Sequence, residues 1–160
     1  MHEFITPKET KKEEKYESII LQIKHLVKDE KDIIGILSNI SAAIHQTFEW
    51  LWVGFYIVKK NQLILGPFQG PVACFRIEKG KGVCGMTWKL NKTIIVPDVE
   101  KFPGHIACSS DSKSEIVLPI KKNNKTFGVF DIDSSELNTF DKTDQKYLEK
   151  IVNIIEKKLG

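Results

Sequence analysis

The sequence predicts an α+β fold, in which two helices are followed by five or six mainly antiparallel strands and a final helix. Apolar residues follow helical spacing in residues 13–28 and 32–48 and again from Asp141 onward. Between these segments, aromatic and β-branched runs are separated by Gly, Pro and Asn, a composition typical of strands and turns. We expect the helices to pack on one face of the sheet, and the long loops to leave a ligand pocket on the other.

The first and last predicted helices carry clear apolar stripes, and Asp32 is placed to cap the second helix. Residues 1–12 are polar and have no periodicity, which predicts a disordered tail before a single domain of residues 13–160. A glycine-rich turn at residues 80–82 should lead into a short helix, and residues 98–112 should form a long loop. The predicted strands are residues 50–58, 61–69, 72–77, 93–96, 114–122 and 125–133.

Composition narrows the class of protein. A chain of 160 residues, 41% hydrophobic and 28% charged, falls within ordinary globular composition. Its 24 basic and 21 acidic residues are spread along the chain, which does not favour a nucleic-acid surface. No apolar run is long enough to predict a membrane span or a signal sequence, so we expect a cytoplasmic protein.

The three cysteines, Cys74, Cys84 and Cys108, are the first candidates for chemistry. An odd count in a reducing compartment argues against a structural disulfide framework. The pair His105 and Cys108 resembles half a zinc site, but the cysteine spacing does not match the usual zinc motifs, so we expect no metal.

The surroundings of these cysteines favour redox chemistry. Cys108 follows Pro103-Gly104 in a serine-rich loop, which predicts an accessible thiol. Cys84 falls near the start of the predicted short helix, where the helix dipole should favour the thiolate. Cys74 lies within a predicted strand and has packing as an equally simple interpretation.

Acidic side chains gather on the last predicted hairpin. In residues 125–133, Phe127, Val129, Asp131 and Asp133 should share one face. A two-residue loop at Asn123–Asn124 would turn Glu115 away from the aspartates, whereas a three-residue loop would pair Glu115 with Asp133. The sequence permits both registers. It also permits the simpler interpretation that the aspartates only end the strand.

The first predicted strand alternates between two kinds of face. Trp52, Gly54 and Tyr56 should point to one side, either as an aromatic wall with a gap at the glycine or as an ordinary strand with a bulge. Residues 51, 53, 55 and 57 should form a uniform core face on the other side.

Several motifs together resemble a known family. WVGFY, GKGVCG, VPDVEKFPGHIAC, SEIVLP and FDIDS occur in this order, and the chain is similar to the free methionine-(R)-sulfoxide reductases, a branch of the GAF-domain proteins. The resemblance covers residues 15–158. It implies a GAF-like fold and a thiol-dependent reductase of free methionine-(R)-sulfoxide.

The resemblance also implies roles for individual residues. Cys108 would be the nucleophile that forms a sulfenic acid, Cys74 the resolving cysteine, and Cys84 a second thiol that assists recycling. Trp52, Tyr56, Glu115, Asp131 and Asp133 would bind substrate, with Glu115 and Asp133 near the sulfoxide oxygen and Asp131 near the ammonium group.

The implied enzyme needs no bound cofactor, and an external dithiol such as thioredoxin, ultimately supplied by NADPH, would reduce its disulfide. The family and the apolar terminal helices suggest a homodimer. We expect neither a membrane nor a nucleic acid among its partners. Two alternatives stay open: a GAF sensor that binds a small ligand without catalysis, and a thiol redox switch.

Overall fold

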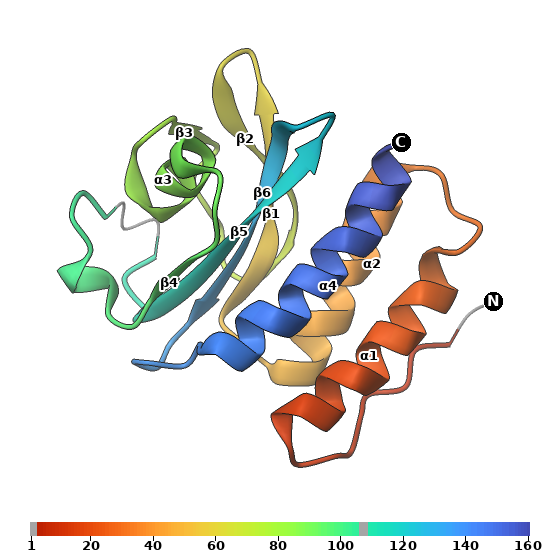
Figure 1. Cartoon of the computed structure of the whole chain (residues 1–160). Coiled ribbons are helices and arrows are strands. Elements are labelled where there is room, and N and C mark those ends of the chain that lie inside the picture. Colours follow the sequence, from red (N-terminus) through yellow and green to blue (C-terminus); the bar gives the residue numbers. More distant parts are fainter. Residues whose placement is uncertain (1–2, 106–108) are drawn as a thin grey trace.

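Six strands form one antiparallel sheet in the order β3-β2-β1-β6-β5-β4 (Figure 1). The computed structural model describes residues 3–105 and 109–160. The strands are β1 (Trp52–Lys59), β2 (Gln62–Gln69), β3 (Arg76–Glu78), β4 (Ile94–Val96), β5 (Ser114–Lys122) and β6 (Lys125–Ser134). The α+β class predicted from the sequence is confirmed.

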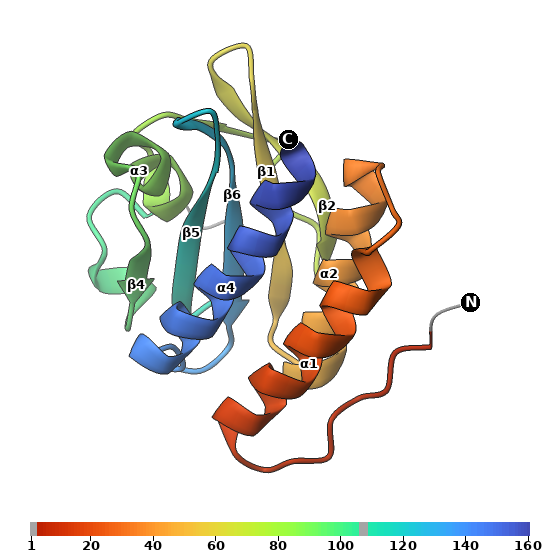
Figure 2. The same ribbon diagram turned by 45° about the vertical axis from the view of Figure 1, so that its right-hand side comes forward.

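Three long helices cover one face of the sheet: α1 (Lys12–Val27), α2 (Ile33–Phe48) and α4 (Lys142–Leu159). In Figure 1, α2 and α4 lie against the sheet, and α1 packs on them from the side away from the sheet. Figure 2 shows α4 crossing in front of β5, which it contacts. The three predicted helices are thus confirmed, with starts and ends that differ by about one residue.

Side chains at the helix starts explain these bounds. Asp32 accepts a hydrogen bond from the backbone N–H of Ile34, as expected of an N-cap. Asp141 and Asp144 form a reciprocal capping box at the start of α4. No helix in the described part of the chain combines the length and the hydropathy that crossing a membrane would require.

The main core lies between these helices and the sheet. Phe55 of β1 stacks on Phe130 of β6, with their ring centroids 4.5 Å apart. Tyr16 of α1 stacks on Tyr147 of α4, which joins the first helix to the last. Most buried members of this core come from α1, α2, α4 and the sheet face that contains Val53, Phe55, Ile116, Leu118, Phe130 and Ile132.

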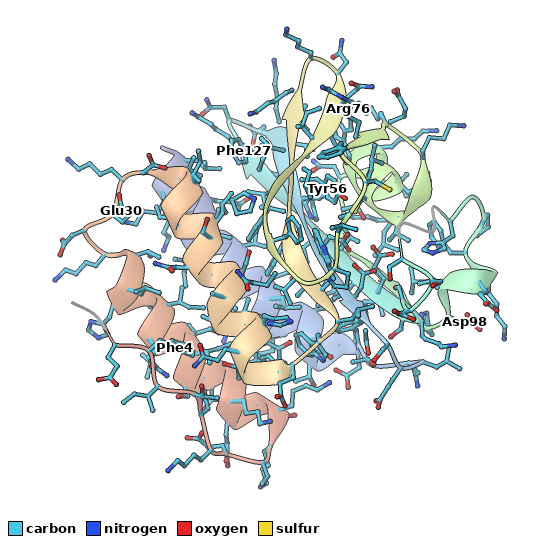
Figure 3. All side chains as sticks on the ribbon, turned by 180° about the vertical axis from the view of Figure 1, so that it is seen from behind. Phe4, Glu30, Tyr56, Arg76, Asp98 and Phe127 are labelled. Atoms are coloured by element: carbon cyan, nitrogen blue, oxygen red, sulfur yellow. The ribbon has the colours of Figure 1, made fainter. Side chains whose placement is uncertain are left out.

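Part of the predicted disordered tail is packed. The backbone N–H of Ile5 donates to Oε1 of Gln22, and Nε2 of Gln22 donates back to the carbonyl of Ile5. Phe4 packs against the main core, and Figure 3 shows it at the helical layer. The prediction of a disordered tail is therefore wrong for Phe4 and Ile5. The packing of Phe4 and the two hydrogen bonds between Ile5 and Gln22 hold this segment in place although most of the tail is polar.

The opposite face of the sheet has a second, smaller core. Its buried members come from all six strands and from α3 (Gly82–Leu90), together with the short 3₁₀ helix η1 (Val99–Lys101). Tyr56, labelled in Figure 3, belongs to this face. The ligand pocket expected on this side is present, as described below.

The segment predicted as a third strand is mostly loop. Only Arg76–Glu78 pairs with β2, and the exposed fractions of Val72 and Phe75 are 87% and 79%. The N–H of Leu65 donates to the carbonyl of Phe75. The next residue of β2 that faces β3 is Pro67, which has no N–H to donate. The pairing between β2 and β3 therefore ends there.

The β5–β6 hairpin combines features of both predicted registers. Asn123 and Asn124 form a two-residue turn with positive φ angles, and Lys122 pairs with Lys125. The register then shifts at a bulge between Ile120 and Lys121, so that Glu115 pairs with Asp133. The extra residue, Phe127, packs with the helical core, which corrects the prediction that it shares a face with Asp131.

Candidate functional site

A cavity opens on the face of the sheet opposite the long helices. Its empty volume is about 600 Å³ when the open solvent at its mouth is included. The strands β1, β5 and β6 supply its floor, the loop of residues 70–75 and the start of α3 supply its walls, and His105, Ser109 and Ser112 line the remaining side. All five substrate-binding residues predicted from the sequence line it: Trp52, Tyr56, Glu115, Asp131 and Asp133.

Aromatic rings form one side of this cavity. Trp52 stacks on Phe68 and on Tyr56, with centroid distances of 5.1 and 5.9 Å. The indole Nε1 of Trp52 donates to the carbonyl of Pro71, and the Tyr56 hydroxyl donates to the carbonyl of Cys74. These two bonds fix the orientation of both rings and tie the loop of residues 70–75 to β1.

The gap expected at Gly54 is filled. Gly54 pairs with Phe68 across the sheet, and a side chain at position 54 would collide with Phe68 and Trp52. The β1–β2 register also shifts between Gly54 and Tyr56, so the strand has both an aromatic wall and a bulge. Sequence reasoning missed Phe68. The sequence did contain a signal for it, because a glycine within a strand is often covered by an aromatic side chain from the neighbouring strand.

Three carboxyl groups meet at the other side of the cavity. Asp131 and Asp133 come from β6, and Glu115 comes from the paired position on β5. Glu115 and Asp131 are buried, with exposed fractions of 5% and 6%, and Asp133 is half-buried. The simpler interpretation, in which the aspartates only end the strand, does not fit this burial.

Burial and mutual repulsion raise the pKa of these acids. The pKa values of Glu115 and Asp133 lie well above their usual range, first because of burial and then because of the charge on Asp131. Burial also raises the pKa of Asp131. Because adjacent carboxyl groups share protons, the cluster stays partly protonated at a pH where free acids are ionised.

The three acids differ in their hydrogen bonds. Oδ1 of Asp133 accepts from the hydroxyl of Ser112 at 3.0 Å. Oδ1 of Asp131 is buried and has no hydrogen-bond partner among the described residues, and the same holds for Nδ1 of His105. Burial lowers the pKa of His105, which favours the neutral imidazole. The cavity therefore offers an acceptor on Asp131 that a ligand can use.

The predicted cysteines have different surroundings. Cys74 is half-buried in the loop of residues 70–75 and packs against the smaller core. Cys84 is buried in α3, lines the cavity and has a free thiol. Cys108 lies outside the described residues, so its predicted role stays a prediction.

The expected thiolate at Cys84 is wrong. Burial raises the pKa of its thiol well above the ordinary value, and the charges of Asp131 and Glu115 raise it further. The helix dipole acts in the opposite direction but is weaker than desolvation in a cavity lined by carboxyl groups. Cys84 is therefore held as a neutral thiol in this arrangement.

Comparisons with known proteins agree with this fold. The family model of the GAF domain matches residues 30–157. GAF domain-containing protein A of Dictyostelium discoideum is 56% identical over 146 residues, which are 91% of this chain and 92% of that protein. The free methionine-R-sulfoxide reductase of Saccharomyces cerevisiae is 46% identical over 155 residues, 91% of this chain and 86% of that protein.

A solved structure extends the likeness to three dimensions. The X-ray structure of free methionine-R-sulfoxide reductase from Neisseria meningitidis in complex with its substrate is 44% identical and superposes with a TM-score of 0.96. The match covers 99% of this chain and 95% of that one. This chain belongs to the GAF-domain family and, within it, to the group that contains the free methionine-R-sulfoxide reductases.

Proposed function

We propose that this protein reduces free methionine-(R)-sulfoxide to methionine. The observation that carries the proposal is the cavity in which Glu115, Asp131 and Asp133 face the aromatic wall of Trp52 and Tyr56. Relatives with the same fold are named for this activity, at identities that favour a shared substrate. The residues of the cavity supply the chemistry that this substrate requires.

Each part of the substrate has a partner in the cavity. The ammonium group of the free amino acid binds the carboxylate of Asp131, whose Oδ1 has no other partner among the described residues. The methyl group packs on Trp52. A residue within a peptide lacks that ammonium group, so the acidic cluster selects the free amino acid.

Glu115 and Asp133 donate protons to the sulfoxide oxygen. Both pKa values are raised by burial and by Asp131, which keeps a proton available near neutral pH. The hydroxyl of Ser112 holds Asp133 in place. A donor that is pre-positioned in a buried cavity favours loss of the oxygen from the sulfur.

Cys108 is the proposed nucleophile. Its thiolate attacks the sulfoxide sulfur and forms a sulfur–sulfur bond, while an acid of the cluster protonates the oxygen. The sulfur–oxygen bond and the new sulfur–sulfur bond then break as the hydroxyl passes to the Cys108 sulfur, which leaves a sulfenic acid on Cys108 and releases methionine. The thiol of Cys74 then condenses with this sulfenic acid, which gives a disulfide and water. A thioredoxin-like dithiol reduces that disulfide by exchange, with NADPH as the ultimate electron source. No bound cofactor takes part in this cycle.

A coupled assay tests the function. NADPH oxidation through thioredoxin reductase and thioredoxin should follow addition of free methionine-(R)-sulfoxide, and the (S) epimer and a peptide-bound sulfoxide should give little turnover. Cys108→Ser should abolish the reaction. Absence of turnover by the wild type, or full turnover by Cys108→Ser, contradicts the proposal and leaves a sensor or a redox switch.

Mass mapping tests the resolving cysteine separately. After substrate is added without reductant, peptides joined through Cys74 and Cys108 should dominate. The burial of Cys84 and its raised pKa make it the slower partner. A dominant bridge between Cys84 and Cys108 would assign the resolving role to Cys84 instead.

Assembly and location follow as further proposals. By resemblance to the family we propose a homodimer, whose interface would be the place to cover Leu21 of α1 and Ile34 of α2, with exposed fractions of 62% and 66%. Light scattering of the purified chain measures its mass directly. A cycle that needs an intracellular dithiol pool also favours the cytoplasm.

A further inference from the structure

Cys84 has a setting that the proposed reaction cycle does not require. Its Sγ, one carboxylate oxygen of Glu115 and one of Asp131 all lie within 4.8 Å of one another. All three residues are buried, and they come from three different elements, α3, β5 and β6. We propose that these three side chains bind a zinc ion, with water as the fourth ligand on the side of the cavity.

The donor set and its spacing fit zinc. Zinc binds thiolate sulfur at about 2.3 Å and carboxylate oxygen at about 2.0–2.2 Å, so its ligand atoms stand roughly 3.2–3.8 Å apart in a tetrahedron. The three ligand atoms lie within 4.8 Å of one another, so small side-chain adjustments are enough to reach that spacing. Calcium and magnesium prefer oxygen ligands alone, so the sulfur of Cys84 favours zinc over them.

An unpartnered oxygen points independently to a bound cation. Oδ1 of Asp131 has no hydrogen-bond partner among the described residues, although 94% of the residue's surface is buried, as its exposed fraction of 6% shows. Buried acceptors are normally satisfied by a partner or a ligand. The lysine that lines the cavity, Lys81, is exposed and does not supply a buried positive charge.

Zinc and the substrate's ammonium group then use the same carboxylate. This consequence rests on the proposed function, because it assigns the ammonium to Asp131. Zinc at this position occupies the substrate site and blocks turnover while it is bound. Release of the ion frees Asp131 to bind the ammonium group and Glu115 to donate a proton, so turnover resumes.

Cobalt provides a direct test that does not depend on activity. In the double variant Cys74→Ser/Cys108→Ser, Cys84 is the only cysteine of the chain. Addition of Co²⁺ to this variant should produce thiolate-to-cobalt charge-transfer absorption in the near ultraviolet and visible bands of a four-coordinate ion. One equivalent of Zn²⁺ should remove both signals.

Variants of single ligands sharpen the test. Adding Cys84→Ser to the double variant should abolish the charge-transfer band. Asp131→Asn and Glu115→Gln should each weaken binding by about tenfold or more. Asp133→Asn is the matched control, because Asp133 is a neighbouring acid outside the donor set, and it should change binding by much less. Circular dichroism spectra that match the parent variant verify that each protein is folded.

The outcomes separate this proposal from the proposed function. No charge-transfer band in the double variant, or a band that survives Cys84→Ser, overturns the zinc site even if the coupled assay succeeds. A Cys84-dependent band in a protein without sulfoxide reductase activity supports the zinc site. That result contradicts only the claim that zinc and substrate compete for Asp131. Equal loss of binding in Asp133→Asn and Asp131→Asn would also contradict the assignment.

Discussion

At the scale of single residues, the acids of the cavity differ in what their oxygens contact. Asp133 is oriented by the hydroxyl of Ser112, whereas Oδ1 of Asp131 has no partner among the described residues. An oriented, protonated acid is suited to proton donation, and an unpartnered acceptor is suited to binding a cation. The two aspartates are two positions apart in one strand, but their surroundings favour different roles.

Replacement of Asp131 by Asn tests the binding role. Removing the charge that faces the ammonium group should raise the apparent KM for free methionine-(R)-sulfoxide by about 10- to 100-fold, the value expected for a charge-assisted hydrogen bond. The turnover number should change less. Steady-state kinetics in the presence of a metal chelator measures both without interference from metal ions.

A nearby exposed acid serves as the control for that variant. Asp111→Asn removes a carboxylate from the segment beside the cavity without touching its lining. This variant should keep the KM of the wild type. An Asp131→Asn protein with unchanged KM would contradict the ammonium-binding role.

At the scale of elements, local sequence signals were sufficient where an element carries its own pattern. The helix stripes, the Asp32 cap and the Asn123–Asn124 turn all appear as predicted. The loop around Cys74 was predicted as strand because the residue at which β3 begins depends on its partner strand. In β2, Pro67 lacks the N–H that would extend the pairing. The bulge at Phe127 was missed because it depends on how two strands pack against different cores.

The start of α4 offers a test of an element by itself. The side chain of Asp141 accepts hydrogen bonds from the N–H groups of Thr143 and Asp144. Asp141→Ala should lower the free energy of unfolding by about 1 kcal/mol, as loss of an N-cap usually does. Urea denaturation measures the difference, and Asp141→Asn, which keeps a capping oxygen, should lose less.

The effect of Asp141 should depend on pH. Burial alone raises its pKa, but hydrogen bonds from the backbone of Asp144 and Thr143 and the charge of Lys12 lower the pKa overall. A lowered pKa in the folded state stabilises the fold above the unfolded value of about 3.9, and this stabilisation is lost as the pH falls through the folded value. The gap between wild type and Asp141→Ala should therefore narrow in acid. A constant gap would contradict the ionic contribution.

At the scale of the whole molecule, the two faces of the sheet have separate tasks. The helical face holds the larger core, in which the first helix α1 packs on the last helix α4. The other face holds the cavity. Alternation along β1 predicted this division, because the two faces carry different side chains. The pKa of Cys84 could not be predicted in this way, since it depends on acids from β5 and β6 that only the fold brings near.

A buried hydrogen bond between the first and last helices tests the larger core. The hydroxyl of Tyr16 donates to Oδ1 of Asp144 at 2.6 Å, and Lys12 pairs with the other oxygen at 2.7 Å. Tyr16→Phe should lower the free energy of unfolding by about 1–3 kcal/mol, because it leaves a buried acceptor without one donor. Urea denaturation at neutral pH gives the value.

Alkaline pH should reduce that difference. Burial first, and then the charge of Asp144 and the hydrogen bond to it, raise the pKa of Tyr16 well above its usual value. A raised pKa stabilises the fold below the unfolded value of about 10, and this contribution is lost as the pH rises further. The wild type should lose stability above about pH 10 more steeply than Tyr16→Phe. Parallel losses in the two proteins would contradict this link.

The bulge at Phe127 has a consequence for how this sequence can vary. A hairpin with a two-residue turn and no bulge encloses an even number of residues between paired positions, whereas an odd number separates Glu115 from Asp133. The extra residue therefore sets the parity on which the acidic cluster depends. A single insertion or deletion at the exposed tip, far from the cavity, would exchange the inward and outward faces of β6. Length changes in this hairpin therefore preserve the acidic cluster only when they add or remove an even number of residues, at the tip alone or shared between the tip and the bulge.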